Sequence, residues 1–300
     1  KTANTTRNAI GEAFELPFDV DVEAWRAAIQ KVADANPMQR VRLIESGKAW
    51  LEPFYQVVER QQPVNFEYLD WSDRTLSRAE LESELDELIL QPWNVLQSPL
   101  LRHYLVRLAS GRHIYVMTAH HAIMDGASRR FYREALLRAY QGEPVPVVTP
   151  AAFLEWVIAR TEKTDTAAVR DFWRHALADA EPLALRAADP GPAQVQTWHL
   201  PQTEYAALEH FCARHQVSVT GYLRALYALA LDHCSYHTTP VVLIDAVAAR
   251  NDVHLETNGC FFQFVPDVLQ KVAPEQTIWD LVQANRLWRK SVGDACYISM

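Results

Sequence analysis

The stretch Thr118-Ala119-His120-His121-Ala122-Ile123-Met124-Asp125-Gly126 decides how the rest of the chain is interpreted. It continues an apolar run, 114–119, that is typical of a strand, and a helical pattern follows it over 131–140. The histidines, the aspartate and the glycine are therefore predicted on a loop between a strand and a helix. Side chains of adjacent residues on extended backbone point to opposite faces. We expect one histidine to face the interior and the other to face a cavity.

The residue types of this loop suit proton transfer. Imidazole titrates near neutral pH, so a positioned histidine can accept a proton from an attacking amine or alcohol. Asp125 lies four residues after His121 and is able to brace the loop through a buried charge pair. Gly126 permits either a close approach of the backbone or a positive φ before the helix.

Three other interpretations of the histidine pair compete with this one. The pair could be ordinary polar residues at a strand end. A catalytic zinc site needs three protein ligands, and adjacent histidines rarely bind one ion. A Ser-His-Asp hydrolase is disfavoured because the chain has no G-x-S-x-G nucleophile elbow.

Composition and charge narrow the class of protein. The chain has 300 residues, 49% hydrophobic and 22% charged, as in ordinary globular proteins of one large domain or two lobes. The formal net charge of −8 argues against nucleic-acid and anionic-membrane partners. Its four cysteines show no C-x-x-C spacing, and no apolar run reaches about 18 residues. A cytoplasmic protein with reduced, buried thiols is predicted.

Helical and strand patterns alternate along the whole chain, which predicts an α/β fold with mixed sheets. Asp21 is expected to cap a helix that ends at Asn36-Pro37. Ser77 and Glu80 form a capping-box pattern. The strands expected are 11–18, 41–51, 54–58, 100–108, 114–119, 241–247 and 260–265.

The predicted organisation is two lobes. The first, 1–180, carries the His-His loop. A linker rich in alanine, proline and aspartate is predicted at 181–194. The second lobe, 195–300, ends in an apolar run without a closing element and is expected to be incomplete.

The loop resembles the H-H-x-x-x-D-G signature of condensation domains of nonribosomal peptide synthetases, which belong to the chloramphenicol-acetyltransferase-like, CoA-dependent acyltransferase superfamily. Further segments resemble this family in the same order along the chain. They are Phe14–Ile29, Asn36–Arg42, Ser98–Arg102, Phe172-Trp173, Val217–Thr220, Asp245–Arg250 and Asn258–Pro266. The similarity covers essentially the whole chain.

The resemblance implies two acetyltransferase-like lobes arranged as a V around a central tunnel. A donor acyl thioester would enter on the phosphopantetheine arm of a carrier protein, or on CoA, and meet an amine or hydroxyl acceptor. The product would be an amide or an ester. The domain would bind no cofactor or metal of its own, and its acceptor would be a small molecule or a carrier-bound nucleophile.

Individual roles follow from the same resemblance. His121 would be the catalytic residue in the tunnel, taking the proton of the nucleophile or orienting it. A backbone N–H near Gly126 would stabilise the oxyanion. Asp125 would pair with Arg40 to hold the loop, and His120 would be structural.

The chain departs from the family at several positions. Gln39 stands in place of leucine, Asn36 of histidine, Gln263 of asparagine and Ala249 of glycine. Heterocyclisation domains, which carry aspartates at the histidine positions, and epimerisation domains, which carry a glutamate absent here, are disfavoured. The alternatives kept are a non-catalytic relative that docks carrier proteins and a stand-alone CoA-dependent acyltransferase.

Overall fold

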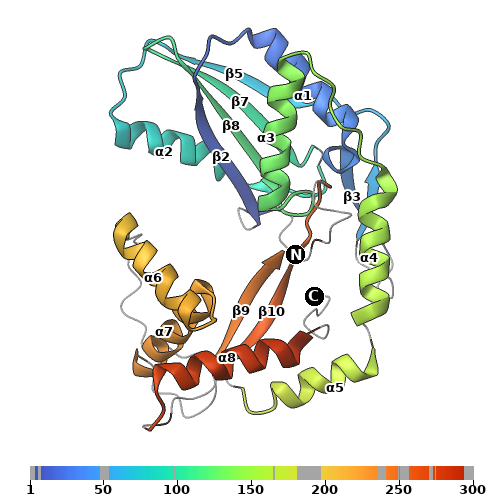
Figure 1. The fold of residues 1–300 in the computed structure, drawn as a ribbon. Coiled ribbons are helices and arrows are strands. Elements are labelled where there is room, and N and C mark those ends of the chain that lie inside the picture. Colours follow the sequence, from blue (N-terminus) through green and yellow to red (C-terminus); the bar gives the residue numbers. More distant parts are fainter. Residues whose placement is uncertain are drawn as a thin grey trace. The chain divides into compact units, whose positions relative to one another are not determined.

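The computed structural model describes residues 4–5, 8–47, 54–97, 99–164, 166–180, 197–234, 241–248, 250, 257–269, 273 and 275–293 (Figure 1). The chain forms two compact units. The first comprises Lys1–Ala159 and Ala249–Phe262, and the second comprises Arg160–Ala248 and Gln263–Met300.

These units differ from the predicted lobes. Helix α5 (Ala167–Ala176), predicted in the first lobe, belongs to the second unit. The segment Ala249–Phe262, predicted in the second lobe, belongs to the first unit. This segment belongs to the first unit because it contacts Asp125 and Ser128, as described below. The predicted linker, 181–194, lies outside the described residues.

A four-stranded sheet forms the centre of the first unit, in the order β2-β8-β7-β5. Its strands are β2 (Ala9–Leu16), β5 (Asn65–Trp71), β7 (Leu101–Leu108) and β8 (His113–His120). Strand β8 runs antiparallel to both neighbours, while β5 is parallel to β7. The β7–β8 hairpin turns at Gly111, whose φ of 79° is the left-handed conformation that glycine adopts readily. This hairpin confirms a prediction, whereas β5 was not predicted.

All eight residues of β8 are buried, because helices cover both faces of the sheet. Alternate residues Tyr115, Met117 and Ala119 pack in one cluster with α1 (Val22–Ala35) and α3 (Gly126–Tyr140). Ile114 and Val116 pack on the other side with Leu85 of α2 (Arg78–Ile89). Burying each large side chain contributes roughly 1.5–3 kcal/mol. Strand β8, which ends at His120, is thus the most completely buried strand of the sheet.

The predicted helix caps are present. The side chain of Asp21 accepts a hydrogen bond from the Ala24 N–H at the start of α1. Ser77 and Glu80 form the predicted capping box of α2. Such caps satisfy backbone N–H groups that have no partner inside the helix. The remaining elements of the first unit are β1 (Asn4–Thr5), η1 (Pro37–Arg40), β3 (Val41–Glu45), β4 (Phe54–Val58), β6 (Trp93–Asn94) and most of α4 (Pro150–Thr164).

The second unit combines helices with a two-stranded sheet of β9 (Val241–Ala248) and β10 (Phe262–Leu269). Its helices are α5, α6 (Gln202–Arg214), α7 (Val219–Cys234) and α8 (Ile278–Val292). Ala225 of α7 and Leu281 and Val282 of α8 form a buried cluster. The mixed α/β fold class is confirmed. The tunnel between two lobes stays a prediction. No helix among the described residues is long and apolar enough to cross a membrane.

Gln39 is 4% exposed and lines a cavity of about 10 Å³ together with Gln62. Neither amide group has a hydrogen-bond partner among the described residues. A buried polar group without a partner costs about 1–3 kcal/mol. We therefore expect Gln39→Leu to raise the free energy of unfolding by about 1 kcal/mol, measured by urea denaturation.

The matched control is Gln56→Leu, because Gln56 is exposed on β4. Its effect should stay within about 0.5 kcal/mol. A loss of stability in Gln39→Leu would show that the Gln39 amide is satisfied, for example by a buried water molecule.

Candidate active site

Two backbone hydrogen bonds fix the end of β8, where the histidines lie. The His120 N–H donates to the Leu100 carbonyl at 3.0 Å, and the His121 N–H donates to the Asn8 carbonyl at 2.7 Å. These partners precede β7 and β2, the strands on either side of β8. The sheet therefore fixes the position of both histidines from both sides.

The imidazole of His121 is held in one orientation and one tautomer. Its Nδ1 lies 2.9 Å from the Met124 carbonyl oxygen. Because a carbonyl only accepts, Nδ1 carries the proton and Nε2 of the neutral ring keeps its lone pair. The ring also packs edge-on against Phe262, with centroids 5.0 Å apart and an interplanar angle of 76°. His121 is half-buried. Its Nε2 is thus available to accept a proton or a hydrogen bond.

His120 is 8% exposed, and its surroundings suit a neutral ring. Its Nδ1 accepts a hydrogen bond from the Ala122 N–H at 3.1 Å, which requires an unprotonated Nδ1. Burial, followed by the neighbouring His121, lowers the pKa of His120. The ring lies 6.4 Å from the ring of Trp93. These contacts favour a structural role for His120.

Asp125 is the N-cap of α3 and is 4% exposed. Its Oδ1 accepts hydrogen bonds from the Ser128 N–H and from Nη2 of Arg250, both at 2.7 Å. Its Oδ2 accepts from the Phe261 N–H at 3.0 Å. Burial alone would raise the pKa of this carboxyl. The Ser128 N–H and the Arg250 guanidinium outweigh burial, so the pKa of Asp125 lies below its usual value.

Ser128 adds a second link between α3 and the segment 257–261. Its hydroxyl donates to the Gly259 carbonyl at 2.7 Å and accepts from the Gly259 N–H at 3.0 Å. Gly259 has a φ of 153°, and a Cβ at this position would lie 2.6 Å from Cδ2 of Phe153. The close approach therefore requires glycine at this position.

The predicted pairing of Asp125 with Arg40 is wrong, since Arg250 occupies that place. Both side chains of the Arg250–Asp125 pair are 5% exposed. Arg250 also donates to the Thr257 carbonyl at 2.5 Å and lies over the ring of Phe261 at 4.2 Å. Arg250 lies in the segment Asp245–Arg250 that resembles the family, but the sequence alone does not indicate that it pairs with Asp125.

Arg40 instead donates to backbone carbonyl groups. Its Nε contacts the Ala33 carbonyl at 3.2 Å, near the end of α1, and its Nη1 contacts the Arg60 carbonyl at 2.9 Å and the Glu59 carbonyl. The carbonyls at a helix end lack partners inside the helix, so a nearby cation satisfies them. Arg40 thus joins α1 to the segment after β4 and does not support the His-His loop.

Gly126 is the first residue of α3 and does not have a positive φ. A Cβ at this position would meet nothing within 4 Å, so the space beside it is open. Among the described residues, the N–H groups of Gly126 and Ala127 have no hydrogen-bond partner. Free N–H groups and the helix dipole make this end of α3 suited to bind negative charge.

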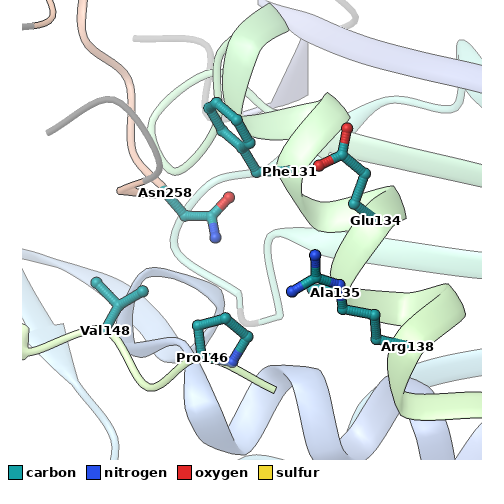
Figure 2. Close-up of a pocket in the computed structure, with 7 residues that line it drawn as sticks. All are labelled: Phe131, Glu134, Ala135, Arg138, Pro146, Val148 and Asn258. Atoms are coloured by element: carbon teal, nitrogen blue, oxygen red, sulfur yellow. The ribbon is translucent and has the colours of Figure 1, made fainter. Parts of the chain in front are cut away.

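A separate small pocket lies along α3, away from the His-His loop (Figure 2). Arg138 and Asn258 point into it, with Pro146 and Val148 on its other side. Asn258 directly precedes Gly259, which Ser128 holds. Among the residues that the structure describes, no cluster of three or more histidine, cysteine, aspartate or glutamate side chains could hold a metal ion.

Comparisons with known proteins agree with the predicted family and with the fold. The family profile of the condensation domain matches residues 9–288. The nonribosomal peptide synthetase NotE of Aspergillus sp. (strain MF297-2) is 30% identical over 275 residues, covering 88% of this chain and 11% of NotE. The chain therefore spans only a small part of this relative.

Solved structures share the fold at lower identity. The first condensation domain of the calcium-dependent antibiotic synthetase has a TM-score of 0.78 at 18% identity, covering 97% of this chain and 70% of that one. The X-domain from teicoplanin biosynthesis, solved in complex with OxyB, has a TM-score of 0.77 at 17% identity, covering 98% and 66%.

The chain belongs to the condensation-domain family of nonribosomal peptide synthetases. Members of this family form amide bonds between substrates that carrier proteins hold on phosphopantetheine arms. The predicted family is confirmed.

A double-mutant cycle tests the partner of Asp125. Removing one member of a buried ion pair costs about 3–5 kcal/mol, because the other charge stays buried without a partner. For Asp125→Ala and Arg250→Ala we expect a coupling of about 2 kcal/mol in the free energy of unfolding. The control cycle, Asp125→Ala with Arg40→Ala, should show a coupling below about 0.5 kcal/mol. Equal coupling in the two cycles would contradict the assignment.

Proposed function

We propose that this chain joins a carrier-bound acyl or peptidyl donor to a carrier-bound amine, with His121 as the catalytic residue. The observation that carries this proposal is the anchored imidazole. Nδ1 of His121 is engaged by the Met124 carbonyl, which leaves the lone pair of Nε2 for the acceptor. Fixing the ring in advance lowers the entropic cost of reaching the reactive geometry.

The reaction proceeds by acyl transfer from sulfur to nitrogen. The amine attacks the thioester carbonyl carbon, a C–N bond forms, and the carbonyl oxygen becomes an oxyanion. The C–S bond then breaks, and the amide and the free thiol of the donor arm are released. The nitrogen loses one proton and the departing sulfur gains one, so the step is balanced. Nε2 of His121 either carries this proton or accepts a hydrogen bond that aims the nitrogen.

The start of α3 supplies the charge stabilisation. The N–H of Gly126 lies at the positive end of a helix of 15 residues, beside open space. An oxyanion that forms at this N–H gains a hydrogen bond that the ground-state carbonyl makes more weakly. Asp125 and Arg250 act as positioning residues, because they hold the end of the loop without facing the substrate.

The two substrates arrive on phosphopantetheine arms of partner carrier proteins, and the domain supplies only side chains and backbone groups. A hydroxyl acceptor, which gives an ester, and CoA as the donor arm use the same attack and the same oxyanion. We propose amide formation as the main reaction, because members of the condensation-domain family form amide bonds. We assign the protein to the cytoplasm, where carrier proteins and reduced thiols coexist.

A second candidate function is a docking relative that binds a partner without acyl transfer. The similarity to the X-domain, which was solved in complex with OxyB, favours this candidate at the level of the fold. The anchored, half-buried His121 favours catalysis, since a docking surface gains nothing from a fixed tautomer.

Substitution of His121 separates the two candidates. We expect His121→Ala to lower the rate of amide formation about 10²–10⁴-fold, the usual contribution of a positioned acid–base group. The measurement is mass spectrometry of product from a loaded donor and acceptor carrier pair, with carrier binding titrated in parallel. His175→Ala, on the exposed face of α5, is the matched control and should retain full activity. Carrier binding without product in the unmutated protein would favour the docking candidate.

Substitution of Gly126 tests the oxyanion role. Proline is favoured at the first position of a helix and removes only the N–H, and the extended backbone of Asp125 (φ −114°, ψ −180°) suits a following proline. We expect Gly126→Pro to keep the melting temperature and to lower the rate of amide formation at least tenfold. Gly126→Ala keeps the N–H and serves as the control. Equal rates for the two variants would exclude this N–H from the reaction.

A further inference from the structure

We propose that a pocket in the second unit, between the start of α7 and the middle of α8, binds a phosphate monoester that carries a small apolar group. The pocket has a volume of about 230 Å³. Among the residues that line it are Val217, Ser218, Arg224, Val282, Asn285 and Arg286. None belongs to the His-His loop, so this inference stands apart from the proposed reaction.

The first element of the pocket is the N-terminus of α7, a helix of 16 residues. Ser218 precedes it and accepts hydrogen bonds at 3.0 Å from the Gly221 N–H on its hydroxyl and from the Tyr222 N–H on its carbonyl. The N–H groups of Val219 and Thr220 have no partner among the described residues. The hydroxyl hydrogen of Ser218 also remains available. This helix end therefore presents several donors together with a partial positive charge.

Asn285 of α8 provides an independent indication of a ligand. It lines the pocket and is only 7% exposed. Its Nδ2 is buried, and no group in the described part of the chain accepts a hydrogen bond from it. Buried donors are normally paired, so Asn285 is a residue of the pocket wall with a donor that the fold leaves without an acceptor.

The charges around the pocket are unbalanced. Arg224 pairs with Asp267 at 2.9 Å and with Asp245, and Arg289 pairs with the same Asp245. Two carboxylates thus compensate two guanidinium groups. Arg286 also lines the pocket and pairs with no carboxylate among the described residues. Its charge is left for an anion.

The walls of the pocket define the rest of the ligand. Val282 and Val217 belong to the apolar cluster that joins α7 to α8. An apolar group attached to the anion would bury surface against them. The hydrogen-bond donors are the N–H groups at the start of α7 and the side chains of Ser218, Asn285 and Arg286. Together they can donate more hydrogen bonds than the two oxygens of a carboxylate can accept. A phosphate ester has three terminal oxygens and two negative charges near neutral pH, so it matches this set better.

The experiment titrates the full chain with phenyl phosphate, inorganic phosphate and benzoate by isothermal titration calorimetry. We expect saturable binding of phenyl phosphate, with inorganic phosphate and benzoate each at least fivefold weaker. Arg286→Gln should weaken phenyl phosphate at least tenfold. Arg78→Gln makes the same change on the exposed surface of the first unit and should have an effect below twofold.

Several results would overturn the proposal. They are no binding of phenyl phosphate at millimolar concentration, benzoate binding as tightly as phenyl phosphate, or Arg286→Gln binding as tightly as the unmutated chain. If Arg286→Gln unfolds, Asn285→Ser replaces it and should weaken binding at least threefold. His121→Ala should bind phenyl phosphate unchanged, so failure of this site and failure of the proposed reaction are distinguishable.

Discussion

The carboxylate of Asp125 joins three parts of the chain, which are α3, Arg250 and the segment 257–261. One oxygen caps α3 through Ser128 and pairs with Arg250, and the other binds the backbone N–H of Phe261. A buried charge is tolerated only when its hydrogen bonds and its counter-ion are in place. The loop between His120 and Gly126 therefore keeps its shape only while the segment 257–261 lies against α3. The orientation of His121 depends on this segment in a second way. Phe262, the residue that directly follows the segment, packs against the imidazole of His121.

The imidazole rings of the two adjacent histidines lie in different surroundings at the end of the same sheet. His120 is the last residue of β8 and shares the burial of the whole strand, so its ring is desolvated and its pKa is lowered. His121 lies one residue further, where the chain leaves the sheet and a carbonyl of the loop is close enough to hold Nδ1. A difference of one position along the strand thus separates a neutral, packed imidazole from one with an available nitrogen. The cause is the end of β8 at His120, which leaves His121 outside the buried strand.

Much of the fold could be predicted from local patterns. The cap at Asp21, the capping box at Ser77 and the hairpin before His120 depend on neighbouring residues, and the structure contains all three. Strand β5 was missed because its burial pattern is irregular and it only pairs along one side, with β7. The partner of Asp125 was missed for a different reason. Arg40 and Arg250 both lie in segments that resemble the family, and only the folded chain shows which guanidinium reaches the carboxylate.

The hydrogen bonds of Asp125 and Ser128 span unusually long stretches of chain. Asp125 and Arg250 are 125 residues apart, and Asp125 and Phe261 are 136 apart. Contacts of this separation form late in folding, because loop-closure entropy must be lost before they form. A ribosome that has released only the central sheet and α3 has therefore made a unit whose His-His loop is not yet held in place. The loop is held once Arg250 and residues 257–261 have emerged. The synthesis of residues 160–248 of the second unit, which precede them in the chain, therefore sets the earliest time at which the first unit is complete.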